Sequence, residues 1–285
     1  MRKPTKRKPA IRKKPTKKKT FFGKRFYTLL GVVLFLVAIA FTAYHYRDAL
    51  AYYFSFRSKH DLKTPNTTKI EGARIFQVLS NHPNKVFGFD VSEYQGTINW
   101  EEAKIVEDTF QLNFVFIRAT AGNDKVDAKF ESNWAQAKEN GIIRGAYHYY
   151  RPNENSIEQA ENFIKTVRLK KGDLPPILDI ENLPKKQSID SLKVGLRRWL
   201  TKVEKHYKVK PIIYSGESYY KDFLEKEFKD YYFWIANYNF FVEEIKDHWL
   251  FWQFTEKATV PGIKGPVDVN IYNGTPKMLD YLVIQ

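Results

Sequence analysis

The apolar run Leu174-Pro-Pro-Ile-Leu-Asp-Ile-Glu181 ends in two carboxylates, Asp179 and Glu181. Residues two apart on a strand point to the same face, so these acids would lie side by side at the carboxyl end of a strand. Neighbouring acids that are partly out of water resist double ionisation, which raises the pKa of one of them and leaves it able to donate a proton near neutral pH. The alternative is a strand that runs into a polar loop with both acids solvated, and this short pattern alone favours that alternative.

Elements that could position these acids alternate along the chain from residue 86 onward. Five apolar segments are expected to be strands, at 86–91, 114–120, 144–150, 174–181 and 210–214. Four helices are expected between them, at 100–107, 128–140, 157–169 and 189–207, with a short helix after the fifth strand. Three further strands follow with little helix between them, at 231–238, 249–255 and 267–272. The pattern predicts an α/β fold, an irregular barrel of five β/α units plus three strands.

Other acids lie where the expected strands end. Asp90 follows Phe89 at the end of the first strand, and Asp268 lies in the last one. In parallel barrels the active site collects at the carboxyl ends of the strands. A single acid there is usually a loop cap, but four that converge on one mouth have no simple structural explanation. Asp90, Asp179, Glu181 and Asp268 are therefore the candidate catalytic residues.

Aromatic and basic side chains accompany these acids. Any one of the rings is more typical of barrel packing, but a ring of amphipathic aromatics around acids suits a sugar, whose faces stack on such rings. His148 alone is more typical of a core residue, and the chain has no cysteine, so we predict no metal site and no cofactor. The candidate substrate-binding residues are Tyr94, Arg118, Tyr147, Tyr149, Tyr214, Trp234, Tyr238 and Trp252.

A series of motifs resembles glycoside hydrolase family 25, the Chalaropsis-type lysozymes. In the family's order they are Gly88-Phe-Asp-Val-Ser-Glu-Tyr-Gln-Gly96, Ile117-Arg-Ala-Thr-Ala-Gly122, Gly145-Ala-Tyr-His-Tyr149, Asp179-Ile-Glu181, Pro211-Ile-Ile-Tyr214, Trp234-Ile-Ala-Asn-Tyr238, Trp252-Gln253 and Val267-Asp-Val-Asn270. The resemblance runs from about residue 86 to the C-terminus. It implies the five-plus-three barrel and hydrolysis of the β-1,4 bond between N-acetylmuramic acid and N-acetylglucosamine in peptidoglycan.

The resemblance also implies a role for each acid. Glu181 matches the general acid, and Asp179 matches the acid that orients the substrate's 2-acetamido group as an internal nucleophile in a retaining route. Asp90 and Asp268 match supporting acids. Whether configuration is retained or inverted depends on the separation of the carboxylates, which the sequence does not give.

One motif departs from the family's usual Lys-Ala-Thr-Glu-Gly. Here it reads Arg118-Ala-Thr-Ala-Gly122, so Ala121 replaces an acid at the rim. The planar guanidinium of Arg118 could bind a carboxylate on the glycan or form a salt bridge within the protein.

The first 46 residues are expected to anchor the chain in a membrane. Residues 1–25 contain thirteen Lys or Arg and no acid, and residues 26–46 form an apolar stretch flanked by aromatic residues. A helix of that length spans one hydrocarbon core, and the basic block keeps the N-terminus cytoplasmic. A cleaved signal peptide is the alternative, with small-residue sites at Ala38-Ile-Ala40 and at 40–43. The basic region and Tyr44 and Tyr46 favour an uncleaved anchor.

The expected domains are thus a basic tail (1–25), a transmembrane helix (26–46), a juxtamembrane segment and linker (47–85) and a catalytic barrel (86–285). The barrel would face the periplasm or the cell surface. The net charge of +15 falls to +2 once the tail is set aside, which argues against nucleic acid as a ligand. The expected partners are peptidoglycan glycan strands and, through residues 26–46, the lipid bilayer, whereas the oligomeric state is not encoded.

Two alternatives remain open at this point. The barrel could be a non-catalytic, membrane-tethered peptidoglycan-binding module, although the intact Asp179/Glu181 pair speaks against this. The basic tail could instead be the functional part and bind anionic lipid or a cytoplasmic partner, although a role in setting membrane topology is simpler.

Overall fold

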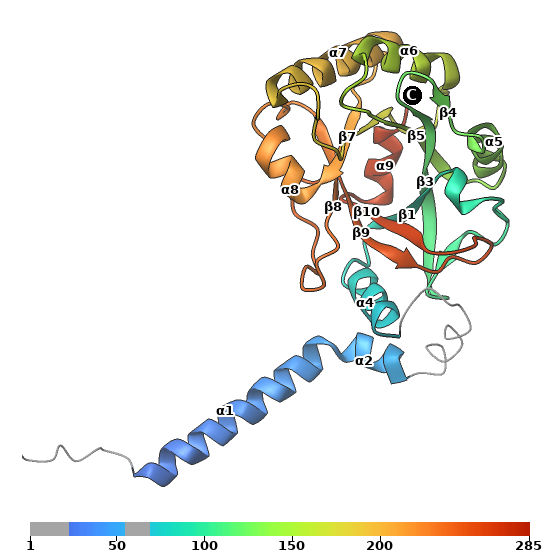
Figure 1. Cartoon of the computed structure of the whole chain (residues 1–285). Helices are drawn as coiled ribbons and strands as arrows, with labels where there is room; N and C mark the ends of the chain where they lie inside the picture. Colours follow the sequence, from blue (N-terminus) through green and yellow to red (C-terminus); the bar gives the residue numbers. More distant parts are fainter. Residues whose placement is uncertain (1–22, 55–68) are drawn as a thin grey trace, which may run out of the picture. The chain divides into compact units, whose positions relative to one another are not determined.

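The computed structural model describes residues 23–54 and 69–285, and the expectations for 1–22 and 55–68 lie outside these ranges. The chain divides into two compact units, Met1–Tyr46 and Arg47–Gln285. The first contains α1 (Lys24–His45), an apolar helix whose segment Arg25–His45 is long enough to cross a membrane (Figure 1). With 22 residues it rises about 33 Å, the thickness of a hydrocarbon core. Its large apolar side chains are exposed.

The second unit is built on a closed barrel of eight strands. Seven of them run parallel in succession, and the eighth, β10, pairs antiparallel with both β9 and β1 and so closes the ring. The order around the barrel is β1 (Val86–Val91), β3 (Phe110–Ala121), β5 (Ile143–Tyr149), β6 (Ile177–Asp179), β7 (Ile212–Gly216), β8 (Tyr232–Ala236), β9 (Phe251–Ala258) and β10 (Val267–Tyr272). The predicted barrel with five β/α units and three further strands is confirmed in its strands.

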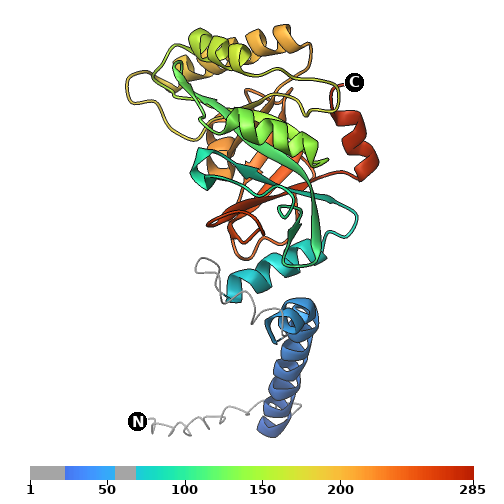
Figure 2. The same cartoon turned by 90° about the vertical axis from the view of Figure 1, so that its right-hand side faces the viewer.

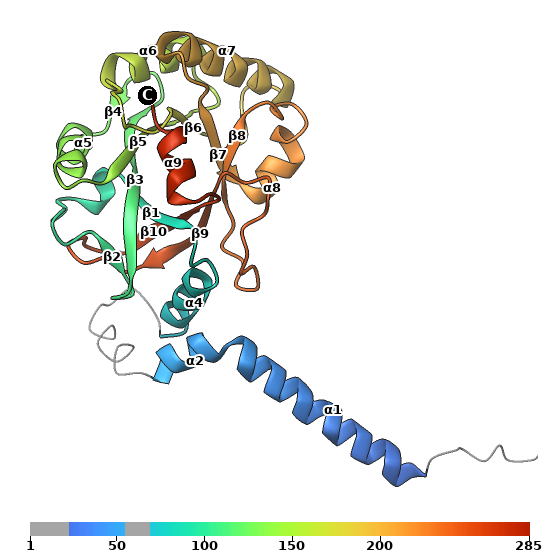
Figure 3. The same cartoon turned by 180° about the vertical axis from the view of Figure 1, so that it is seen from behind.

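Helices cover the side of the barrel that β3 to β7 form. Figures 1 and 3 show α6 and α7 side by side, and Figure 2 shows the same unit turned by 90°. The helices are α5 (Phe130–Glu139), α6 (Ser156–Thr166), α7 (Ile189–Tyr207), α8 (Glu217–Tyr219) and the single turn η3 (Tyr220–Leu224). The last helix, α9 (Pro276–Leu282), closes the amino end of the barrel, because Leu279 packs in one cluster with Val86 and Ile177, the first residues of β1 and β6.

One expected helix, at 100–107, does not form. Buried Trp100, Ala103 and Val106 recur every third residue, which imitates a helical stripe. The segment instead makes turns and ends in β2 (Ile105–Val106), which pairs with the start of β3. Glu107 and Asp108 have φ values of 50° and 51°, a left-handed pair that reverses the chain. The pairing of β2 with β3 therefore overrides the local pattern. A second short strand, β4 (Lys125–Val126), pairs with the other end of β3.

The segment expected to be a linker contains a helix of the barrel unit. Helix α4 (Lys69–Ser80) packs against β9 and buries Ile75, Val78 and Leu79 in the main core. The short helix α2 (Arg47–Phe54) packs on α4, and the Ala49 amide donates to Gln77 Oε1 at 3.1 Å. The compact unit thus begins at Arg47 and differs from the predicted boundary at 86. The reason is that α4 covers strands that have no helix of their own after them.

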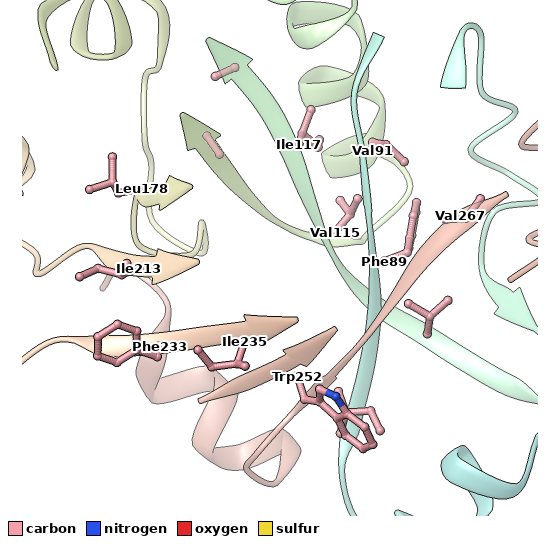
Figure 4. Packing of buried hydrophobic residues seen from close by; sticks show 14 of the residues in the cluster. Phe89, Val91, Val115, Ile117, Leu178, Ile213, Phe233, Ile235, Trp252 and Val267 are labelled. Atoms are coloured by element: carbon pink, nitrogen blue, oxygen red, sulfur yellow. The ribbon is translucent and has the colours of Figure 1, made fainter. Parts of the chain in front are cut away.

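Alternation along the strands separates two sets of buried side chains. Phe89, Ile117, Leu178, Ile213 and Trp252 belong to the large apolar cluster that also contains residues of the surrounding helices (Figure 4). Their neighbours along the chain therefore point into the barrel, since adjacent residues on a strand face opposite sides. This alternation brings the polar side chains to the mouth of the barrel.

Candidate active site

A cavity of about 910 Å³ lies at the carboxyl ends of the parallel strands. All four candidate acids line it: Asp90, Asp179, Glu181 and Asp268. They come from three different strands or strand ends, as the sequence predicts. β6 ends at Asp179, so Glu181 lies just beyond it, yet the i, i+2 spacing still places both acids on the cavity side.

The electrostatics of the acid pair are set by burial. Asp179 is 4% exposed, and its Oδ1 is buried with no hydrogen bond to a described residue. Burial and the adjacent Glu181 carboxyl raise the pKa of Asp179 well above its usual value. Burial also raises the pKa of Glu181. Two acids in this position resist double ionisation, so their surroundings favour a pair that holds one proton.

A hydrogen-bond network holds Asp90. Its Oδ2 accepts from Gln253 Nε2 at 2.7 Å and from Asn270 Nδ2 at 2.8 Å. Trp234 Nε1, which can only donate, reaches Asn270 Oδ1 at 2.8 Å and so fixes which end of that amide faces Asp90. Burial and the neighbouring Asp268 nevertheless raise the pKa of Asp90 well above its usual value. Asp90 is thus held firmly in a site that disfavours its charge.

Asp268 faces Asp90 across the β1–β10 pair. Burial, and next the charges of Glu256 and Glu181, raise the pKa of Asp268 to about 7. Glu256 also lines the cavity. The cavity therefore contains several acids close enough for the charge of one to disfavour ionisation of another.

Seven of the eight candidate substrate-binding residues line the cavity: Tyr94, Arg118, Tyr147, Tyr149, Tyr214, Trp234 and Tyr238. Tyr94 stands at the rim and is 79% exposed, whereas Tyr147, Tyr214 and Trp234 lie deeper. Trp252 is placed elsewhere. Its ring is fully buried in the outer core beside Trp249 and Phe254, and its Nε1 donates to the carbonyl of Asn237 at 3.0 Å.

Arg118 makes salt bridges within the protein. Its Nε donates to Asp127 Oδ2 at 2.9 Å, and its Nη2 lies 3.1 Å from Glu93 Oε1. Its guanidinium also lies 4.6 Å from the centre of the Tyr94 ring. Of the two roles considered for Arg118, the structure shows the internal salt bridge, which fixes the rim next to Tyr94.

Several residues of the site were not among the candidates. Gln253, Glu217, Asn237 and Glu256 line the cavity. Gln253 and the fully buried Asn270 donate to Asp90. Alternation could have found Gln253, because an outward Trp252 places its neighbour inside the barrel. Asn270 lies two residues after Asp268 and shares its face for the same reason.

A comparison with models of protein families identifies the family of this chain. The family model described as "Glycosyl hydrolases family 25" matches residues 89–263, which is more than half of the chain. The chain belongs to glycosyl hydrolase family 25. The resemblance seen in its motifs is confirmed, and the protein is a glycoside hydrolase.

Known proteins are similar to this chain over most of its length. Lysozyme M1 of Streptomyces globisporus is 32% identical over 73% of this chain and 78% of its own length. The uncharacterised protein YegX of Escherichia coli K12 is 40% identical over 70% of this chain and 73% of its own length. A solved family 25 glycosyl hydrolase from Bacillus anthracis is 28% identical and superposes with a TM-score of 0.63, over 71% of this chain and 95% of the other.

Proposed function

We propose that this family 25 hydrolase is an N-acetylmuramidase that cleaves the β-1,4 bond between N-acetylmuramic acid and N-acetylglucosamine in peptidoglycan. The observation that carries this proposal is the buried Asp179/Glu181 pair with raised pKa values inside a cavity walled by aromatic rings. The relative from Streptomyces globisporus is a lysozyme, which agrees with this substrate.

In this proposal Glu181 is the general acid. Burial raises the pKa of its carboxyl, which favours the protonated form that donates to the glycosidic oxygen as the bond breaks. Asp179, next to it on the cavity wall, would interact with the substrate's 2-acetamido group and stabilise the positive charge that develops on the sugar ring. The unpartnered Oδ1 of Asp179 is an acceptor that such an amide N–H could satisfy.

Asp90 and Asp268 would hold the sugar from the opposite side of the mouth. The two amides that bind Oδ2 of Asp90 leave its other oxygen for substrate. The rings of Tyr147, Tyr149 and Trp234 supply faces on which a pyranose can stack. Tyr94 and Tyr238 extend this surface to the rim.

The test is a digestion of purified peptidoglycan by the full-length protein and by its Glu181→Gln variant. Mass spectrometry identifies the sugar at each new reducing end. We expect muramic acid ends from the wild type and none from the variant, because Gln keeps the volume but cannot donate the proton. Glucosamine ends would mean that a different bond is cleaved. If neither protein produces ends but both bind the wall, the non-catalytic binding module is correct.

We also propose that α1 is a single, uncleaved membrane anchor with its basic side in the cytoplasm and the barrel outside. The length and composition of Arg25–His45 support this proposal, as do the flanking charges. Because the chain lacks cysteine, an introduced Lys138→Cys or Thr5→Cys reports the location of one site. In intact cells an impermeant maleimide should label Cys at 138 and spare Cys at 5. The reverse pattern contradicts the topology, and a mature protein that lacks residues 1–43 contradicts the anchor.

A further inference from the structure

Arg74 on α4 binds a neighbouring loop through its guanidinium. The loop connects β8 to β9 and comprises residues 237–250. Arg74 Nη2 donates to the carbonyls of Asn239 at 2.9 Å and Val242 at 3.4 Å, and Nε donates to that of Phe240 at 3.3 Å. Nη1 donates to the carbonyl of Phe254 in β9 at 2.9 Å. One side chain thus joins α4, the β8–β9 loop and the barrel.

The end of α4 adds two weaker contacts to the same loop. Asn81 Nδ2 lies 3.4 Å from Glu243 Oε2, and the Ile245 amide donates to His82 Nε2 at 3.4 Å. The His82 Nδ1 lies 2.7 Å from the carbonyl of Val78, and its Nε2 also lies 3.3 Å from Glu244 Oε2 of the same loop. These contacts all lie on the half of the loop that follows Asn239.

The other half of the loop is part of the cavity wall. Asn237, Tyr238 and Asn239 line the cavity, and the Tyr238 hydroxyl donates to Gln253 Oε1. The end of the loop is held by Trp249, which is buried in the main core, whereas its tip is open, with Phe240 45% and Phe241 81% exposed. The tip therefore depends on outside contacts to keep one conformation.

We propose that Arg74 is a positioning residue for substrate binding, which fixes the Asn239 end of the cavity wall formed by residues 237–239. This inference rests on the proposed muramidase function. Arg74 lies outside the residues that match the family model, 89–263. The helix that precedes the barrel therefore contributes to the affinity of the site without touching the sugar.

The shape of the side chain explains why Arg is needed at this position. A guanidinium presents five N–H donors in a rigid plane, and here four hydrogen bonds reach four carbonyls of two segments. A Lys ammonium is a compact point charge with three donors and cannot span the same set. Arg74→Lys should keep the charge and the apolar stem but release part of the loop.

The experiment measures kcat and KM of the full-length protein in detergent with a peptide-free peptidoglycan octasaccharide. Arg74→Ala and Arg74→Lys are compared with Arg198→Ala, an exposed Arg on α7, as the control. We expect KM to rise by about tenfold in Arg74→Ala and by less in Arg74→Lys, with kcat within about twofold, because lost binding that is equal in ground and transition states changes KM alone. Arg198→Ala should match the wild type.

A second measurement separates this inference from the proposed function. In the Glu181→Gln background, the affinity for the octasaccharide should fall by about the same tenfold when Arg74 is replaced, whether or not the wild type cleaves it. Unchanged KM and affinity with a lowered Tm would show that Arg74 only stabilises the fold, and a fall in kcat alone would also overturn the proposal. If Arg74→Ala does not fold, Arg74→Lys decides.

Discussion

Two acids that are almost equally buried in this barrel have opposite surroundings. Asp173 is 3% exposed and bound by the Arg144 guanidinium, at 2.8 Å from Nε and 3.4 Å from Nη2. Asp179 is 4% exposed, and within the described ranges, 23–54 and 69–285, it has no salt bridge. Its pKa is raised by burial and by Glu181. The two carboxyls are buried to nearly the same degree, so what distinguishes them is whether a cation is bound.

The same contrast appears between two glutamates near the mouth. Glu93, at the rim, is bonded to Lys125 and to the Ala128 amide, and these contacts lower its pKa. Burial raises the pKa of Glu181 inside the cavity. Contacts with a cation and an amide thus favour the charged form of Glu93 at the rim, while burial disfavours the charged form of Glu181 in the cavity.

The largest effect on activity should come from Asp179, the buried acid without a bound cation. Asp179→Asn keeps the size of the side chain but removes the carboxyl proposed to stabilise the positive charge on the sugar, so we expect kcat to fall on the order of a thousandfold. Stability should stay the same or rise, because an uncompensated buried carboxyl is removed. Steady-state kinetics and thermal unfolding measure the two quantities. A destabilised variant with a normal kcat would show that Asp179 serves the fold and not the reaction.

Breaking the salt bridge between Arg144 and Asp173 should lower stability and leave activity unchanged. Arg144→Ala leaves Asp173 buried without its cation and removes the hydrogen bond of Arg144 to the carbonyl of Trp134. We expect a loss of about 3 kcal/mol in the free energy of unfolding. At the same time kcat per folded molecule should remain unchanged. Denaturant titration with an activity assay at matched folded fraction checks both, and a selective loss of kcat contradicts the structural role.

The raised pKa of Asp268 predicts that the stability of the protein depends on pH. Its folded pKa, about 7, lies above that of an unfolded Asp, so its contribution to stability is complete below about pH 4 and is lost as pH rises toward 7. Asp268→Asn removes this loss. We expect the variant to gain about 4 kcal/mol over the wild type at pH 8 relative to pH 4. Denaturant titrations at both values measure the difference, and parallel curves for the two proteins would refute the shifted pKa.

The smallest effect is expected at the exposed rim. Lys125 is 42% exposed in its side chain and contacts Glu93, so Lys125→Ala should cost less than about 1 kcal/mol of stability. High salt should reduce this cost further. The control is the Arg144 variant, whose buried pair salt screens much less. An effect of Lys125→Ala as large as that of Arg144→Ala would remove the distinction between rim and interior.

Regular elements were predictable from local pattern alone. The strands at 86–91 and 267–272 and the helix at 189–207 have the predicted bounds. Their apolar residues repeat with the period of their own element, which requires no knowledge of the rest of the fold. Asp90, Asp179 and Glu181 were found in the same way, because they follow from parallel strands whose carboxyl ends form the mouth. Asp268 lies near the amino end of β10, which reaches the same mouth because β10 runs antiparallel to β1.

The contacts of the side chains could be learned only from the tertiary structure. Gln253 meets Asp90 across 163 residues of sequence, and Arg118 meets Asp127 and Glu93 rather than open solvent. Helix α4 joined the core, and Trp252 faced outward, because closure of the barrel fixes which side of each strand is inside. A local pattern gives the period of a strand but not its direction. The partners of a carboxylate, and therefore its pKa, depend on contacts between segments that only the closed barrel brings together.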